Sequence, residues 1–218
     1  MRAGPVRLVL TALLLARPFS TSAGAQPVPP ELAASLALEH RLRDMMTVVS
    51  SRYEVDVVLR SEPAGAARLE LRGHLESVTA TLSPPPPPGA RAGAPPPRSE
   101  PRRVAIDERW LGHVRRDGDT LVVRLERTDA YRPALAVSVP WRCSRETIAL
   151  DGQATSVWAC RTAQAGTTAA GPGHPLPPYL QVPLYLLPPA ERLRVEARAR
   201  GGADHRSSIE SVRFSRRP

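Results

Sequence analysis

Apolar and polar residues alternate with a period of two along most of the chain, which is the pattern of half-buried strands. The alternation is regular in RYEVDVVLR from residue 52 and continues in ARLELRGHLESVTATL, residues 67–82. In the second run the apolar residues change parity after Leu75. A β-bulge near Gly73 or Ser77 would account for that change.

Residues 30–49 show a different spacing, which predicts a helix. Pro30 suits the first helical position, and Glu31 suits the positive end of the helix dipole. An apolar stripe at helical spacing follows: Leu38, Leu42, Met45, Met46 and Val49. We therefore expect residues 26–50 to be an N-terminal segment with one amphipathic helix, docked either on the domain or on a partner.

The segment CSRETIALDGQATSVWAC begins and ends with the two cysteines of the chain. Asp-Gly between strand-like runs predicts a two-residue type I′ turn, with Asp151 and Gly152 at its centre. Residues then face each other when their numbers sum to 303, so Cys143 lies directly opposite Cys160. This register predicts a disulfide within a single hairpin.

The same register assigns the tryptophans of this hairpin to one face. Trp141, Cys143 and Arg145 share that face with Trp158 and Cys160. Because Arg145 and Trp158 are opposite each other, a cation–π contact is expected. The alternative is that the two tryptophans simply cover the disulfide as part of the core.

A second Asp-Gly pair, in RWLGHVRRDGDTLVVRLER, predicts another hairpin. With Asp117 and Gly118 at the turn, opposed residues have numbers that sum to 235. One face of this hairpin is apolar, and its residues are Trp110, Gly112, Val114, Leu121, Val123 and Leu125. The apolar face should fix the register.

Two long segments interrupt the strands. Residues 83–103, SPPPPPGARAGAPPPRSEPRR, contain consecutive prolines and predict an extended polyproline spacer. Residues 163–178 are a loop rich in glycine and proline. The run YLQVPLYLL that follows contains Pro183, which predicts an edge strand or an irregular one.

These elements indicate an all-β protein. We predict an immunoglobulin-like β-sandwich of about nine or ten short antiparallel strands, covering residues 51–218 and interrupted by the proline-rich loop 83–103. The run LPPAERLRVEARARG, residues 187–201, resembles the closing part of bacterial immunoglobulin-like modules, which implies the same architecture. The cysteines depart from the antibody pattern, because they join one hairpin and not two sheets.

Residues 1–25 have the layout of a secretory signal peptide. A basic start is followed by the short apolar run LVLTALLLA and by Ala-Gly-Ala at residues 23–25. No second long apolar run follows, so no membrane span is expected after removal of the signal. The predicted disulfide also favours a secreted or periplasmic protein. Mitochondrial import is the alternative, because the segment contains arginine and serine and no acidic residue.

The composition is basic, and every one of the 30 basic residues is arginine. Removal of residues 1–25 leaves 27 arginines against 21 acidic residues, a formal charge of +6. This charge predicts affinity for anionic polymers or surfaces. No basic run is interleaved with aromatic residues, so nucleic-acid binding is not expected.

No catalytic or metal-binding motif is present in the sequence, and no cofactor is expected. We therefore predict an exported, non-catalytic protein that binds another macromolecule, either a protein or an envelope polymer. The alternative is a carbohydrate- or small-ligand-binding module. The candidate binding residues in that case are Trp110, Trp141, Trp158 and Arg145.

Overall fold

The computed structural model describes residues 27–44, 47–81, 99–129, 132–162, 176–201 and 207–217. Within them the chain forms ten strands, one four-residue α-helix and two short 3-10 turns. The strands are β1 (Glu31–Asp44), β2 (Thr47–Ser61), β3 (Ala66–Thr81), β4 (Arg102–Asp117), β5 (Thr120–Asp129), β6 (Arg132–Leu150), β7 (Gln153–Thr162), β8 (Leu184–Leu186), β9 (Leu193–Gly201) and β10 (Ser207–Arg216). Helix α1 is Pro178–Gln181, and the 3-10 turns are Pro63–Gly65 and Pro189–Glu191.

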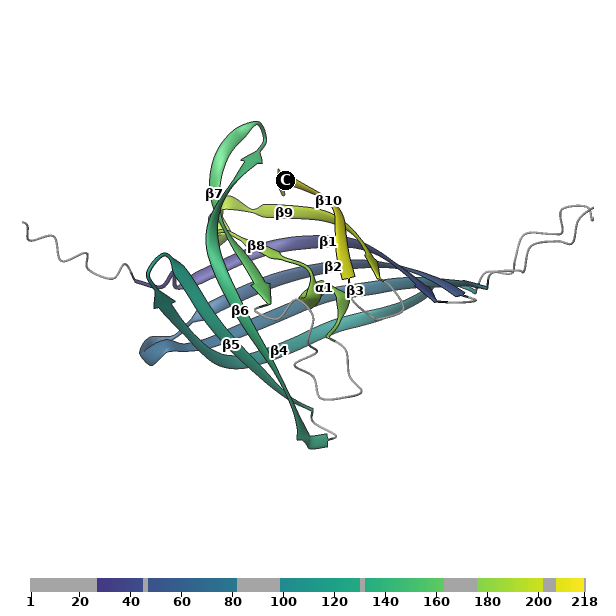
Figure 1. The fold of residues 1–218 in the computed structure, drawn as a ribbon, viewed down its shortest axis with the longest axis horizontal. Helices are drawn as coiled ribbons and strands as arrows, with labels where there is room; N and C mark the ends of the chain where they lie inside the picture. Colours follow the sequence, from purple (N-terminus) through teal and green to yellow (C-terminus); the bar gives the residue numbers. More distant parts are fainter. Residues whose placement is uncertain are drawn as a thin grey trace, which may run out of the picture.

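All ten strands belong to one sheet, in the order β10-β9-β1-β2-β3-β4-β5-β6-β7-β8. The expectation of an all-β protein is therefore confirmed. The immunoglobulin-like sandwich is not, because this single sheet curls into a half-barrel (Figure 1). Strands β1 to β7 each pair with the next strand along the chain, and several are 14 to 19 residues long. Long twisted strands roll a continuous sheet, whereas a sandwich needs connections that cross between two sheets.

The predicted N-terminal helix is wrong, because residues 31–44 form strand β1. Every second residue from Leu32 to Leu38 is buried and faces the interior, which is the burial pattern of a strand. β1 is antiparallel to β2 on one side and parallel to β9 on the other. This two-sided pairing outweighs the local helical spacing, which relied on Met45 and Met46, two residues outside the described parts of the chain.

The two ends of the sheet overlap where the roll comes together. Ala33 of β1 exchanges two backbone hydrogen bonds with Leu187, just after β8, with N–O distances of 2.7 and 3.1 Å. From Ser35 onward β1 pairs with β9 instead. The rings of Tyr185 and Phe214 meet edge to face at 4.8 Å, so β10 packs against the outside of β8.

The concave side of the sheet encloses one hydrophobic core. Leucines and valines from nearly every strand point inward, and all three tryptophans lie among them. Helix α1 covers this side, and its Tyr179 meets Tyr53 of β2 edge to face at 5.4 Å. Burial raises the pKa of the Tyr53 hydroxyl.

The bulge predicted near Gly73 or Ser77 is absent from β3, which pairs with β2 and β4 in continuous register. Gly73 is instead a point of close approach. A Cβ atom there would lie 1.8 Å from the carbonyl oxygen of Glu54. The parity changes because β2 and β3 continue beyond the core, where the outward side chains of Val78 and Ala80 are partly buried.

The two hairpins differ in how well the sequence predicted them. Between β6 and β7, Asp151 and Gly152 both have positive φ, and residues that sum to 303 face each other, as expected. Between β4 and β5 the register sums to 237, not 235, because Gly118 and Asp119 form the turn. Only Gly118 has positive φ there, which is the requirement of a type II′ turn.

The remaining predictions concern loops and the termini. The edge strand predicted in YLQVPLYLL is confirmed only for β8, Leu184–Leu186, which lies at one end of the sheet, because Pro178–Gln181 form helix α1. The proline-rich loop and the second loop fall largely on residues 82–98 and 163–175, and the signal peptide falls on residues 1–25, all outside the described parts. Among the described residues, no helix has the length and apolar character needed to cross a membrane.

Candidate functional site: a basic cluster on the convex face

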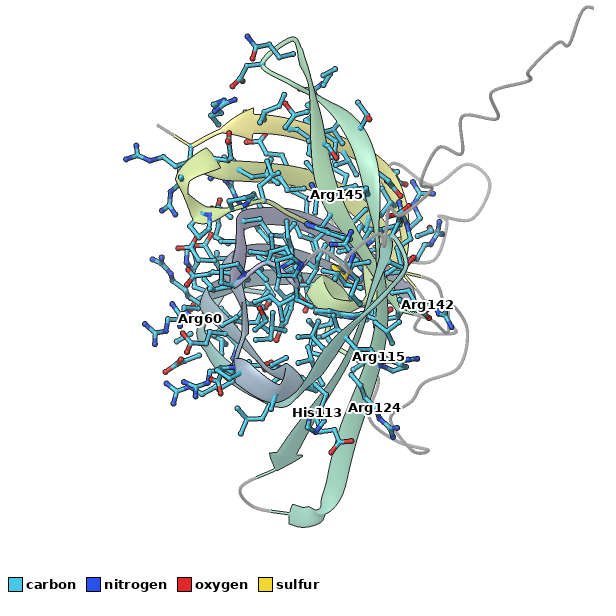
Figure 2. The ribbon with its side chains drawn as sticks, turned by 90° about the vertical axis from the view of Figure 1, so that its left-hand side faces the viewer. Arg60, His113, Arg115, Arg124, Arg142 and Arg145 are labelled. Carbon is cyan, nitrogen blue, oxygen red and sulfur yellow. A yellow bond between two sulfur atoms is a disulfide. The ribbon has the colours of Figure 1, made fainter. Side chains whose placement is uncertain are left out.

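The convex face of β4, β5 and β6 carries the side chains that alternate with the core. Gly112 and Val114 point inward on β4, so His113 and Arg115 point outward. Arg124 of β5 and Arg142 of β6 point outward for the same reason. We call these four residues, His113, Arg115, Arg124 and Arg142, the basic cluster. Figure 2 shows them together on neighbouring strands, with Arg60 on the other side of the molecule.

The strand register places the cluster in two rows across the sheet. Arg115 lies opposite Val122, and Val122 lies opposite Arg142. Neighbouring strands are about 4.8 Å apart, so the backbones of Arg115 and Arg142 are about 10 Å apart across an intervening valine. In the adjacent row His113 lies opposite Arg124. The cationic groups are close enough to act jointly on one anionic chain.

Arg115 and Arg142 have no acidic partner among the described residues. Arg124 does have one, because its Nε lies 3.5 Å from a carboxylate oxygen of Glu126 on the same strand. Leu111 extends the same face and is 57% exposed, one of two large apolar side chains exposed in the described structure. The surface therefore combines two uncompensated arginines with an apolar contact.

Arginines elsewhere on the convex face are mostly paired with carboxylates. On β1, β2 and β9 the pairs are Arg52–Glu54 at 2.8 Å, Arg60–Glu31 at 3.0 Å, Arg194–Glu196 at 3.1 Å and Arg198–Glu39 at 3.0 Å. Glu54 raises the pKa of Arg52, and Glu31 raises the pKa of Arg60, through hydrogen bonds to the guanidinium groups. The charges of these arginines are already neutralised by carboxylates, so this part of the surface should attract an external anion less strongly.

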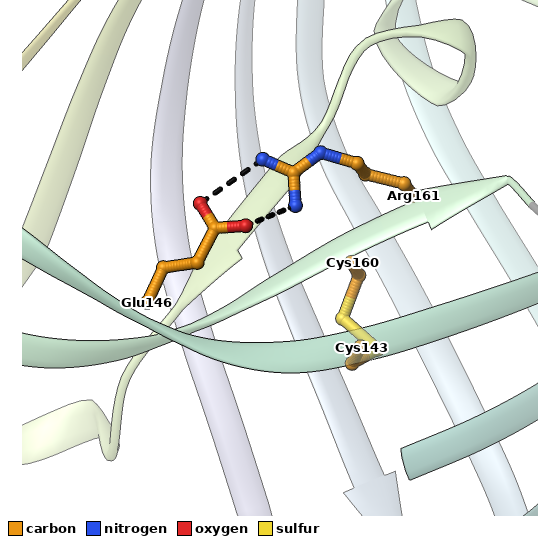
Figure 3. Close-up of a disulfide and its surroundings, with 4 residues drawn as sticks. All are labelled: Cys143, Glu146, Cys160 and Arg161. Atoms are coloured by element: carbon orange, nitrogen blue, oxygen red, sulfur yellow. Dashed lines mark hydrogen bonds and ion pairs between the residues drawn. A yellow bond between two sulfur atoms is a disulfide. The ribbon is translucent and has the colours of Figure 1, made fainter. Parts of the chain in front are cut away.

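The disulfide predicted between Cys143 and Cys160 is present, with the two Cα atoms 3.9 Å apart (Figure 3). Both sulfurs are buried in the core. On the other face of the hairpin Glu146 accepts two hydrogen bonds from Arg161, one of them at 3.0 Å, and this contact raises the pKa of the Arg161 guanidinium. The hairpin is thus held by a covalent bond on one face and by a bidentate ion pair on the other.

The candidate tryptophans do not form a surface in this structure. Trp110, Trp141 and Trp158 are each only 1–2% exposed, so their rings belong to the core. Arg145 is exposed, and its guanidinium carbon lies 4.4 Å from the centre of the Trp158 ring, as the cation–π prediction requires. The cation–π contact is therefore present, and the burial of both tryptophans agrees with the alternative that their rings are part of the core.

His40 is the only buried polar or charged side chain among the described residues. Its Nε2 lies 3.0 Å from the hydroxyl of Ser207, and the backbone amide of Ser207 donates to the side-chain oxygen of Gln181 at 3.1 Å. Burial lowers the pKa of the His40 imidazole. No described carboxylate contacts the ring, so this contact links β1, α1 and β10 without the third member of a catalytic triad.

No group of three or more histidine, cysteine or acidic residues in the described parts is arranged to hold a metal ion. The basic cluster could not be predicted from the sequence, because arginine is spread along nearly every strand. Its members come from three strands and meet only through the register.

Comparison with known proteins finds no match to a family model, to a curated protein or to a solved structure.

Proposed function

We propose that this chain is an exported, non-catalytic protein that binds an anionic polymer of the cell envelope through the basic cluster. The observation that carries the proposal is the pair of uncompensated arginines, Arg115 and Arg142, on an exposed face beside Leu111. Guanidinium groups match carboxylate, sulfate and phosphate groups with two parallel hydrogen bonds. Because neither arginine has an acidic partner among the residues that the structure describes, both are ready to make such contacts.

An extended polymer fits this surface better than a small ligand does. The cluster lies across three strands of an open face, and its cationic groups are spaced at strand intervals. A polyanion could engage several groups at once, and the release of its counterions would favour binding. A binding module built on the tryptophans has less support, since the rings are buried.

Retention on immobilised polyanions tests this proposal. The probes are a carboxylated chain, polygalacturonate, and a sulfated chain, heparin. We expect the wild-type protein to be retained at low salt, and Arg115→Glu/Arg142→Glu to elute at clearly lower salt, with affinity reduced by about tenfold or more. Vesicles rich in phosphatidylglycerol form a separate arm, and preferential binding to them would replace the polymer with a lipid surface.

A matched variant separates a local site from a general effect of net charge. Arg52→Glu/Arg198→Glu makes the same change in charge on β2 and β9, where both arginines are paired. We expect this control to lose much less affinity than Arg115→Glu/Arg142→Glu. Equal losses in the two variants, or no retention of the wild-type protein, would contradict the proposal.

Export is tested by the mature N-terminus. Cleavage after the Ala-Gly-Ala sequence would give a chain that begins at residue 26. We expect intact-mass measurement of protein recovered from outside the cytoplasm to give that chain, with both cysteines oxidised. An uncleaved chain in the cytoplasm would contradict the export part of the proposal and leave the polyanion test unaffected.

A further inference from the structure

Within the described part of the chain, one stretch of β4 has a strand neighbour on one side only. β4 pairs with β3 from Arg102 to His113, whereas its pairing with β5 begins only at Leu111. Figure 1 shows β5 and β6 diverging from β4 along this stretch. Among the described residues no strand pairs with residues 102–110 on the β5 side, so that side is an open sheet edge.

The backbone groups at this edge are aimed outward. Asp117 and Thr120 flank the two-residue turn and therefore exchange hydrogen bonds with each other. Because the direction of the backbone groups alternates along a strand, the N–H and C=O groups of Arg103, Ala105 and Asp107 point toward the open side. Such groups are a template for another strand.

The sequence of this edge is complementary to itself. Residues 102–108 read RRVAIDE, with two basic residues, three apolar ones and two acidic ones. In an antiparallel pair of two copies centred on Ala105, opposed residues have numbers that sum to 210. Arg103 then faces Asp107, Arg102 faces Glu108, and Val104 faces Ile106. Every charged side chain meets an opposite charge, and the apolar ones meet each other.

Two features that protect an edge, proline and bulges, are missing from this stretch. Natural edge strands are also blunted by charged side chains, but the four charged residues here become complementary in the antiparallel pair of two copies. Residues 102–108 contain no proline, and their register with β3 is uninterrupted. Val104 is 39% exposed and is the second exposed large apolar side chain in the described structure. Pro101 has no N–H group, so it marks the natural end of a ladder.

We propose that this edge binds a second copy of the chain, giving a two-fold symmetric dimer in which β4 pairs with β4 about Ala105. Such an interface is isologous, because each surface contacts its own copy. The proline-rich segment that precedes β4 is a poor alternative occupant, since consecutive prolines cannot donate to a ladder. Seven residues per strand bury a small area, so the dimer should be weak, with a Kd of roughly micromolar or above.

Sedimentation equilibrium over a concentration series tests the dimer. We expect the full mature protein to shift from monomer to dimer as its concentration rises, and Ala105→Pro to remain monomeric. Proline at Ala105 removes an N–H group on the open side and leaves the ladder to β3 intact, so circular dichroism should be unchanged. A wild-type protein that is monomeric at all concentrations would overturn the proposal. So would a dimer that persists in a folded Ala105→Pro variant.

Charge exchange keeps the proposal testable even if the proline variant does not fold. Arg103→Asp and Asp107→Arg each place like charges in both symmetric pairs, so each variant alone should dimerise at least about tenfold more weakly. A mixture of the two variants places Asp opposite Arg in both pairs and should recover the dimer.

Intrachain effects cannot produce this recovery. Arg103 lies 3.7 Å from Glu76, and Asp107 lies 3.9 Å from Arg72, and both contacts are the same before and after mixing. Failure of the mixture to associate more strongly than its components would overturn the proposal. Slow hydrogen exchange at Ala105 in a monomer would do so as well, because it would show the edge covered by the chain itself. Polyanion retention is measured separately, so neither proposal depends on the other.

Discussion

The β4–β5 and β6–β7 hairpins share one turn motif but are held together in different ways. Both contain Asp-Gly, and both place apolar residues on the concave side. In β6–β7, a disulfide requires Cys143 to lie opposite Cys160, and the turn centred on Asp151 and Gly152 agrees with it. In β4–β5 no covalent bond specifies the register, and the turn moves by one residue to Gly118 and Asp119.

The difference shows what an apolar pattern can and cannot specify. Register sums of 235 and 237 place the same residues of β4 and β5 on the concave face, because moving the register by two residues preserves parity. The pattern therefore predicts the face but leaves the partner of each residue undecided. A cysteine pair removes that ambiguity, and turn geometry together with neighbouring strands resolves it in β4–β5.

Removing the disulfide should have the largest effect on this comparison. Cys143→Ala/Cys160→Ala opens a loop with a sequence separation of 17 residues, and we expect a loss of about 3 kcal/mol in the free energy of unfolding. Urea denaturation of the variant and of the oxidised wild-type protein measures the difference. A loss well below 1 kcal/mol would mean that the turn and the core already fix β6–β7, as they do β4–β5.

A second, engineered disulfide would test the register of β4–β5 directly. Val114 and Val123 lie opposite each other and are both buried. We expect Val114→Cys/Val123→Cys to oxidise readily and to stabilise the fold by about 2 kcal/mol, less the packing lost with the valines. The matched variant, Val114→Cys/Leu121→Cys, pairs the residues that a sum of 235 would oppose. Thiol counting decides between the two registers, and ready oxidation of the matched variant alone would contradict the structure.

Replacing Gly112 should destabilise the β4–β5 hairpin more than replacing Gly118, the glycine in its turn. A Cβ atom at Gly112 would lie 1.9 Å from the carbonyl oxygen of Arg124, so Gly112→Ala should force the strands apart and cost about 1–3 kcal/mol. Gly118 has φ of +59° but open space around it, so Gly118→Ala should cost about 1 kcal/mol. Thermal unfolding ranks the two variants, and the reverse order would mean that the close approach is relaxed in solution.

The smallest effects are expected from the outer charges of the two hairpins. Glu146→Gln breaks the ion pair with Arg161. The side chains of Glu146 and Arg161 are 34% and 44% exposed, so the free energy of unfolding should fall by less than about 1 kcal/mol. Arg142→Gln removes a charge with no described acidic partner and should leave stability within about 0.5 kcal/mol of wild type. A larger loss in Arg142→Gln than in Glu146→Gln would show that the basic cluster has a structural role.

Local patterns predicted the strands well and the overall architecture poorly. Alternation identified β2 and the concave faces of β3 and β4, and turn chemistry gave the β6–β7 register. The helical assignment of β1 failed because β9, one of the two strands that pair with β1, lies well over a hundred residues further along the chain. No local window contains that information. The roll of the sheet and the burial of Trp110, Trp141 and Trp158 depend on the same distant contacts.

The basic cluster could not be predicted from the sequence for a related reason. Arg115 and Arg142 are conspicuous only because nearby acidic residues pair with other arginines, and such pairing depends on which strands are neighbours. The charge of the mature chain did predict an affinity for anions. It could not assign that affinity to a face.

The parallel pairing of Ser35 with Arg194 has a consequence for how the chain is made. Among the described strands β1 is synthesised first. It cannot pair with β9, one of its two neighbours, until nearly the whole polypeptide has emerged from the ribosome. Loop-closure entropy must be overcome across that separation, so folding should be slow compared with that of helical proteins of similar size. The proposed export would make use of this interval, because β1 cannot complete its pairing before β9 has been made.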